Sequence, residues 1–204
     1  MFSESLLPLL NSYYAICLES PLIERRNVLE YLVQQFNLPL FTWNLAVQEL
    51  RPLKQSISEN SWTKFNNIKS VLLTWQKRNK PGILIIENGL LLVKDSGFDI
   101  LLTEVINSCQ GLDKFLIFLE MNGKGVPDSL VSVIPSFCLP IPTVNDLEQL
   151  AQKLNLTTDL LLPGLGLYTE EIAQGVRLAQ GSNTAIDDTL LNYKIERFQA
   201  LGLA

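Results

Sequence analysis

Five short apolar runs, separated by longer amphipathic stretches, set the main limit on how this chain can fold. The runs are residues 14–19 (YAICLE), 39–43 (PLFTW), 82–87 (GILIIE), 115–120 (FLIFLE) and 136–141 (SFCLPI). The middle runs are continuously hydrophobic instead of alternating, which is typical of parallel strands that helices cover on both faces. The pattern therefore predicts five strands of a buried parallel sheet.

Amphipathic helices are expected between these runs. In residues 21–36 apolar side chains recur along one face, and Pro21 stands where a first helical turn tolerates it. Residues 62–77 and 97–109 carry the same kind of stripe. Strands that alternate with helices predict a doubly wound α/β fold, in which right-handed crossovers place helices on both faces of the sheet.

The pattern changes at the fifth run. Pro140 interrupts it, and because Pro cannot donate to a central ladder, this run is expected at an edge or an end of the sheet. Three helical patterns follow, in residues 146–154, 170–180 and 185–201. The sequence thus predicts an α/β domain over residues 1–142 and a small helical subdomain over residues 143–204. The polar residues 54–61 are expected to form a loop.

Composition excludes several classes of protein. The 204 residues carry a net charge of −5, whereas a nucleic-acid partner calls for a basic surface. His is absent, which removes the commonest general base and any Ser-His or Cys-His pair. No apolar run approaches the roughly 18 residues that span a bilayer. The three cysteines form no C-x-x-C pair, so neither a zinc site nor a redox motif is supported. They are odd in number and widely spaced, and we expect a cytoplasmic protein in a reducing compartment.

A glycine-lysine turn, Gly123-Lys124, follows the fourth run and invites comparison with a phosphate-binding loop. That loop has the pattern G-x-x-x-x-G-K-[ST], because its backbone N–H groups wrap the phosphates and its hydroxyl binds magnesium. Here Phe118 stands in place of the first glycine and Gly125 in place of the hydroxyl residue. We therefore interpret the segment as a plain turn at a strand end.

The connection after the first run is where a fold of the phosphate-loop type would carry that loop. It contains no glycine, Pro21 has no N–H, and Glu19 would repel a triphosphate. Arg25 and Arg26 could attract an anion, but we expect them on a solvated helix face. Residues 83–88 (ILIIEN) resemble the strand that orients magnesium and water in nucleotide hydrolases, although Asn88 cannot act as a general base.

Three of the runs end in a glutamate, namely Glu19, Glu87 and Glu120. Ligands of an open parallel sheet bind outside the carboxyl ends of its strands. One interpretation is a carboxylate cluster that binds Mg²⁺ or another hard cation, which Asp95 and Asp99 could join. The other is that each glutamate marks where its strand meets water and pairs with a cation such as Arg25 or Lys124. The sequence leaves both open.

Several segments together resemble one known family. They are residues 14–32 (YAICLESPLIERRNVLEYL), 37–44 (NLPLFTWN), 80–88 (KPGILIIEN), 126–130 (VPDSL), 139–143 (LPIPT) and 192–203 (NYKIERFQALGL). In this order they look like the N-terminal half of an uncharacterised AAA-ATPase-like protein family of cyanobacteria and algal plastids. The resemblance covers nearly the whole chain and stops where the ATPase module of that family would begin.

The resemblance implies a degenerate AAA+ domain, a three-layer fold of the P-loop type with a parallel five-stranded sheet and a C-terminal helical lid. Its strand order would place Glu19, Glu120 and Glu87 side by side. It also implies a non-catalytic interaction or regulatory module without a cofactor, which binds a protein such as an AAA ATPase relative or a second copy of itself. The alternative is a divalent-metal-dependent enzyme or weak nucleotide binder that uses these three glutamates.

Overall fold

The computed structural model describes residues 6–53, 63–90 and 97–200 of the chain. The chain divides into two compact units, Phe2–Leu139 and Pro140–Ala204, each with its own hydrophobic core. The sequence analysis places the boundary after residue 142, a little later along the proline-rich segment.

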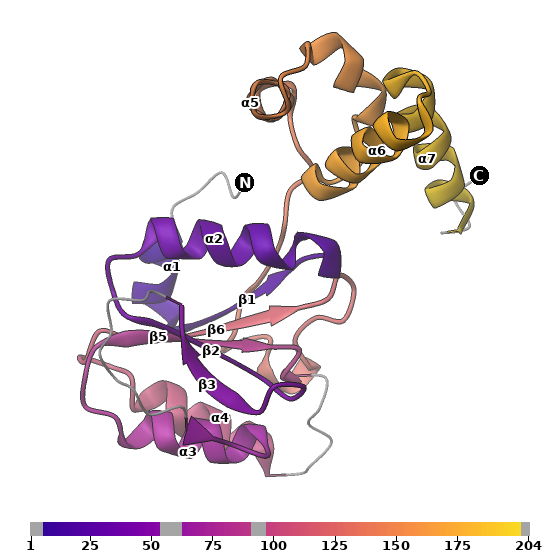
Figure 1. Cartoon of the computed structure of the whole chain (residues 1–204). Coiled ribbons are helices and arrows are strands. Elements are labelled where there is room, and N and C mark those ends of the chain that lie inside the picture. Colours follow the sequence, from indigo (N-terminus) through magenta and orange to yellow (C-terminus); the bar gives the residue numbers. More distant parts are fainter. Residues whose placement is uncertain (1–5, 54–62, 91–96, 201–204) are drawn as a thin grey trace. The chain divides into compact units, whose positions relative to one another are not determined.

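The first unit contains a seven-stranded sheet in the order β4-β3-β2-β5-β6-β1-β7 (Figure 1). Five of its strands run parallel, namely β1 (Ala15–Glu19), β2 (Leu40–Asn44), β5 (Gly82–Glu87), β6 (Lys114–Glu120) and β7 (Ser136–Cys138). They coincide with the five apolar runs. β7 lies at an edge, as expected for the run that Pro140 interrupts.

Two further strands raise the number from the expected five to seven. β3 (Glu49–Pro52) pairs antiparallel with β2, and β4 (Thr63–Lys64) pairs antiparallel with β3. Both strands are short. The residues of β3 are mostly half-buried and those of β4 are exposed, so neither strand has the continuous apolar run that marks a buried strand. The polar loop expected over residues 54–61 lies outside the described residues.

In the described part of this unit four helices cover the sheet, namely α1 (Leu6–Tyr13), α2 (Arg25–Gln35), α3 (Ile68–Lys77) and α4 (Phe98–Asn107). α1 and α2 lie on one face, and α3 and α4 lie on the other (Figure 1). The sequence analysis did not expect α1. It expected the helix that corresponds to α3 to begin at residue 62. In the structure α3 begins at Ile68, and the Asn67 side chain caps it by accepting a hydrogen bond of 2.9 Å from the backbone N–H of Ser70.

The sheet has a core on each face because successive strand residues point to opposite sides. Cys17, Ile86 and Phe118 pack in one cluster with Trp75 of α3 and Leu102 of α4. The intervening strand residues and the inward face of α2 are also fully buried, among them Ile16, Leu18, Ile85, Ile117, Val28 and Leu32. This burial on both faces holds the strand ends in place.

The second unit consists of α5 (Val144–Leu154), a 3₁₀ segment (Thr158–Gly164), α6 (Thr169–Ser182) and α7 (Ile186–Ala200). A small apolar cluster joins them, made chiefly of Leu147, Leu161, Leu167, Ile172, Val176 and Leu190. None of the helices in the described part of the chain is both long and apolar enough to cross a membrane.

Candidate functional site

The parallel strands bring three acidic side chains to one edge of the sheet. Glu19 of β1 and Glu120 of β6 are direct register partners, and Glu87 of β5 stands opposite Leu119, one residue before Glu120. The order β5-β6-β1 is the one that the resemblance implies. We call Glu19, Arg25, Glu87, Asn88 and Glu120 the strand-end cluster.

Both carboxylate oxygens of Glu19 are hydrogen-bonded by other segments of the chain. Ser136 Oγ donates to Oε1 at 2.6 Å, and the backbone N–H of Gly123 donates to Oε2 at 2.9 Å. Gly123 has φ +71°, a conformation that suits glycine. The glycine-lysine turn therefore binds an oxyanion, but that oxyanion is a carboxylate of the same chain.

Glu120 is fully buried, and so does not mark a place where a strand meets water. The backbone N–H of Leu90 donates to its Oε1 at 2.9 Å, while Oε2 has no hydrogen-bond partner among the described residues. Burial raises the pKa of Glu120, and the hydrogen bond from Leu90 and the charge of Arg25 offset part of that rise. The Glu120 side chain thus holds the turn that follows β5, where Asn88 has φ +52°.

Arg25 lies inside the strand-end cluster. Its Nη1 donates to the backbone carbonyl of Leu119, its Nη2 donates to Asn88 Oδ1 at 3.0 Å, and its Nε lies 3.9 Å from Glu87 Oε2. Only 11% of its side chain is exposed, so the expectation of a solvated helix face is wrong for Arg25. The expectation holds for Arg26, whose side chain is 88% exposed and pairs with Glu30 one turn along α2.

The connection between β1 and α2 has already used most of its backbone donors. The N–H of Ser20 donates to the Glu120 carbonyl, that of Glu24 to the Pro21 carbonyl, and that of Arg25 to the Leu22 carbonyl. Pro21 has no N–H. The connection therefore lacks the row of free N–H groups with which a phosphate loop surrounds its ligand.

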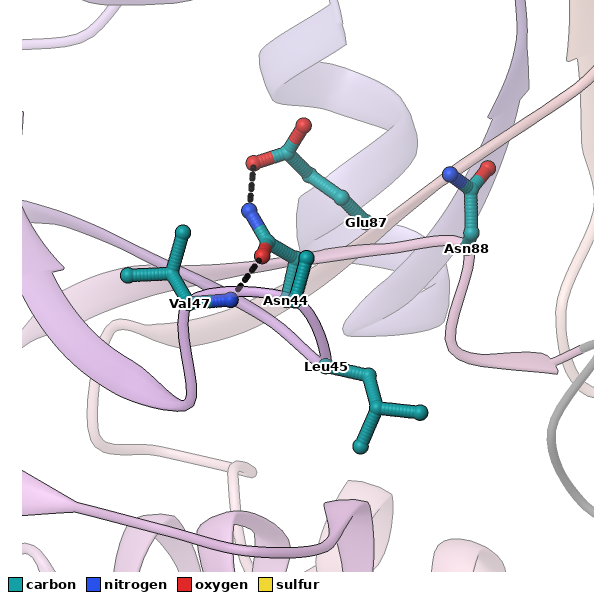
Figure 2. A pocket seen from close by; sticks show the side chains of 6 residues that line it. Asn44, Leu45, Val47, Glu87 and Asn88 are labelled. Atoms are coloured by element: carbon teal, nitrogen blue, oxygen red, sulfur yellow. Dashed lines mark hydrogen bonds between the residues drawn. The ribbon is translucent and has the colours of Figure 1, made fainter.

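A pocket of about 650 Å³ opens beside Glu87, at the ends of β2 and β5 (Figure 2). Its lining consists of Asn44, Leu45, Ala46, Val47, Glu87 and Asn88. Asn44 Nδ2 donates to Glu87 Oε1 at 3.2 Å, and Asn44 Oδ1 accepts a hydrogen bond of 2.9 Å from the backbone N–H of Val47 (Figure 2). Thr42 Oγ1 also donates to Glu87 Oε1, at 3.0 Å. The sequence analysis missed this pocket, although three apolar residues in the turn after β2 are a signal for it.

The metal site expected at Glu19, Glu87 and Glu120 stays a prediction. Among residues 6–53, 63–90 and 97–200, no group of three or more His, Cys, Asp or Glu side chains is placed to hold a metal ion. The cation that these residues do hold is Arg25, next to Glu87. Asp99 stands in the first turn of α4, and Asp95 lies outside the described residues.

Comparison with known proteins identifies the fold. No protein-family model and no curated protein matches the chain. Among solved structures, the RuvB Holliday junction branch migration motor of Thermotoga maritima is similar over 92% of this chain and 64% of its own, with 13% identity and a TM-score of 0.52.

Two further solved structures are similar to this chain over most of its length. A katanin structure described for its self-assembly covers 85% of this chain and 63% of its own, with 15% identity and a TM-score of 0.54. The replication initiator DnaA, bound to AMPPCP and single-stranded DNA, is similar over 86% of this chain and 58% of its own, with 16% identity and a TM-score of 0.50.

All three proteins are AAA+ ATPases, and this chain spans less than two thirds of each. At such low identity the likeness shows the fold alone. It confirms the predicted α/β fold of the AAA+ type with a mostly parallel sheet, except that the sheet has seven strands instead of five.

Proposed function

We propose that the chain is a non-catalytic AAA+-like interaction or regulatory module that binds a protein partner. One observation carries the proposal. The guanidinium of Arg25 lies at the carboxyl ends of β5 and β6, where it donates hydrogen bonds to the Leu119 carbonyl and the Asn88 side chain. In a phosphate-loop fold that place, between the first strand and the first helix, receives the phosphates.

Three features of the chain argue against nucleotide hydrolysis. The connection before α2 contains no glycine, and most of its N–H groups already donate to carbonyls of the chain. Glu19 and Glu87 would repel phosphate oxygens, and Asn88 cannot accept a proton from water. The chain also has no His that could serve as a general base in their place.

The partner in this proposal is an AAA ATPase relative or a second copy of the chain. The AAA+ fold supports this choice, since katanin, a structural neighbour, self-assembles. We also propose that residues 1–142 and 143–204 are the two domains. The proposal further includes membership of the cyanobacterial and plastid family and a cytoplasmic location. The three cysteines are free thiols in the structure, as cytoplasmic proteins usually keep them.

Isothermal titration with MgATP tests the catalytic half of the proposal, with a phosphate-loop ATPase as the positive control. We expect no saturable heat and no phosphate release above buffer. Tight MgATP binding, or a turnover that Glu87→Ala abolishes, would contradict it. Sedimentation of the chain over a range of concentrations, alone and mixed with an AAA ATPase from the same cell, tests the partner half. A chain that stays monomeric in both experiments contradicts that half.

The second candidate is a divalent-metal-dependent enzyme or weak nucleotide binder that uses Glu19, Glu87 and Glu120. It is favoured by the direct register pairing of Glu19 with Glu120 at the edge that also carries Glu87. On this hypothesis millimolar Mn²⁺ raises the melting temperature by mass action, and the rise disappears in Glu87→Gln and Glu120→Gln. If the rise persists in both variants, the metal is bound elsewhere.

A further inference from the structure

We infer that the outer side of α7 is a docking surface for a basic amphipathic helix of the partner protein. The inference rests on the proposed function, because it names the chemistry of the partner and the place where it binds. α7 is the last helix of the second unit and lies beside α6 (Figure 1). We call Asp187, Asp188, Leu191, Ile195 and Glu196 the α7 docking face.

The inner side of α7 is defined by its contacts within the second unit. Leu190 is fully buried and belongs to the apolar cluster of that unit. Lys194 donates from Nζ to the Leu165 carbonyl at 2.5 Å, next to the 3₁₀ segment. Arg197 pairs with the buried Glu171 of α6. These contacts hold α7 in the unit and leave its other side outside the core.

The outer side of α7 exposes two large hydrophobic residues one helical turn apart. Leu191 is 48% exposed and Ile195 is 44% exposed. Residues four apart lie on the same side of a helix, so the two side chains form one apolar stripe. Because Leu190 already anchors the helix from its inner side, this stripe is a second one. Apolar residues on two sides are typical of a helix that packs against something on both.

Acidic side chains surround the stripe. Asp187, Asp188 and Glu196 are exposed, whereas both cations between residues 186 and 199 bond on the inner side. The helix dipole favours acids in a first turn, which accounts for Asp187 and Asp188. It does not account for Glu196 in the second half of the helix. Negative charge therefore extends along the whole stripe.

Charge complementarity selects the occupant of the docking face. Residues 140–204 contain eight acidic and four basic residues, so most of the net charge of −5 lies in the second unit. A second copy of the chain would place acids against acids, which disfavours self-docking on this face. A helix that carries Lys or Arg beside its own apolar stripe buries Leu191 and Ile195 and pairs with the acids around them.

A nuclear magnetic resonance titration of the full chain tests the inference. The probe is the peptide acetyl-KLKALLKKLAK-amide, whose Leu residues share one side of a helix and whose Lys residues share the other. One comparison peptide carries Glu in place of Lys, and another has the same composition in an order without an apolar stripe. We expect saturable shifts of the side-chain amide signals of Asn192 and Gln199, which are exposed on α7. The reordered peptide should bind at least about tenfold more weakly, and the Glu peptide should cause no shift.

A double variant tests the apolar stripe. Leu191→Gln combined with Ile195→Gln should weaken binding of the Lys peptide at least about tenfold, because it removes both anchors. Leu73→Gln is the matched control, since Leu73 of α3 is 42% exposed, and it should leave binding unchanged. Thermal unfolding of the double variant shows whether the second unit is still folded.

A second pair of variants tests the charges and does not alter the apolar residues. Asp188→Asn combined with Glu196→Gln should weaken binding several-fold and make it less sensitive to added salt. Glu104→Gln combined with Glu148→Gln removes the same charge from exposed positions of α4 and α5 and should leave binding unchanged. This test stands even if the substitutions at Leu191 and Ile195 unfold the helix.

Several outcomes would overturn the inference. They are equal binding of the three peptides, binding without shifts at Asn192 and Gln199, or equal loss of binding in the α7 variants and their controls. Self-association of the chain that the Leu191→Gln, Ile195→Gln variant abolishes would also overturn it, because a second copy would then cover the face.

Failure here is distinguishable from failure of the proposed function. If the AAA ATPase cosediments with the Leu191→Gln, Ile195→Gln variant as well as with the wild type, the module binds its partner through another surface and the inference is wrong. If the Lys peptide binds at α7 but no AAA ATPase cosediments with the wild type, the docking face stands and the proposed partner is wrong.

Discussion

The guanidinium of Arg25 donates a hydrogen bond of 3.0 Å to the side-chain oxygen of Asn88, and so joins the first turn of α2 to the end of β5. The same guanidinium donates to the carbonyl of Leu119 at the end of β6. One side chain therefore connects a helix with two neighbouring strands at the carboxyl edge of the sheet.

Replacement of Arg25 by Met should destabilise the first unit by about 2 kcal/mol, because it leaves the Leu119 carbonyl and the Asn88 side-chain oxygen without their donor and Glu87 without its ion-pair partner. Urea denaturation followed by tryptophan fluorescence measures this, since Trp43 and Trp75 are buried in that unit. Arg26→Met is the matched control and should stay within about 0.5 kcal/mol of the wild type. Equal effects of the two variants would refute a structural role for Arg25.

The buried carboxyl of Glu120 should make stability depend on pH. Burial raises its pKa, so the folded state binds this proton more tightly than the unfolded state does. The stabilisation is complete below the ordinary pKa of a glutamate and is lost as the pH rises through the raised value. Relative to Glu120→Gln, the wild type should therefore lose stability over this window, by at most about 1.4 kcal/mol per pH unit. Urea denaturation curves of both proteins at a series of pH values measure this difference. If the free energies of unfolding of wild type and Glu120→Gln change with pH in parallel, the prediction is wrong.

Lys114 is a fully buried lysine at the start of β6, and its Nζ donates to the backbone carbonyl of Gln76 at 3.2 Å. Burial lowers the pKa of Lys114 from its ordinary value of 10.5, so the unfolded state binds this proton more tightly. Stability of the wild type relative to Lys114→Met should rise with pH between the lowered value and 10.5.

At neutral pH the Lys114→Met variant should be at least as stable as the wild type, because an apolar chain of similar volume replaces a buried charge. Thermal unfolding of both proteins at pH 7 and pH 10 measures the difference. A variant that is less stable by the same amount at both pH values would show that the hydrogen bond to Gln76 outweighs the cost of burial.

Gly175 permits the close approach of α6 and α7. A Cβ at this position would lie 2.6 Å from Cδ2 of Leu190, which is fully buried. Gly175→Ala should therefore cost the second unit about 1–2 kcal/mol. Gly181→Ala, in the same helix, meets no atom within 4 Å and should stabilise the helix by about 0.5–1 kcal/mol. Amide hydrogen exchange in α6 and α7 distinguishes the two variants, because exchange should become faster in Gly175→Ala and not in Gly181→Ala. Faster exchange in both variants would contradict the packing argument.

The sequence could predict the parallel strands because each is a continuous apolar run that needs no knowledge of its neighbours. It did not reveal β3 and β4, which are short strands beyond β2 whose residues are half-buried or exposed. It also missed α1, whose run LLPLL shows no polar face. Such elements owe their structure to the sheet and the helices around them, which local periodicity does not record.

The strand-end cluster was predictable only in part. Three glutamates at the ends of parallel strands had to lie at one edge, but their surroundings differ. Glu120 is buried, Glu19 is held by Ser136 and Gly123, and Glu87 lines a pocket. The sequence analysis expected both Arg25 and Arg26 on a solvated helix face, because the sequence does not reveal that Arg25, in the first turn of α2, bonds to the strand ends.

The sequence by itself determined the class of fold and the absence of a glycine-rich loop after the first strand, since both depend on neighbouring residues. Only the tertiary structure decided which charges meet. Arg25 lies 94 residues from Leu119 and 63 residues from Asn88 along the chain, and the crossovers of the sheet bring them together. Hydrogen bonds and electrostatic interactions act over a few ångströms, so they follow this arrangement in space and not the order of residues in the sequence.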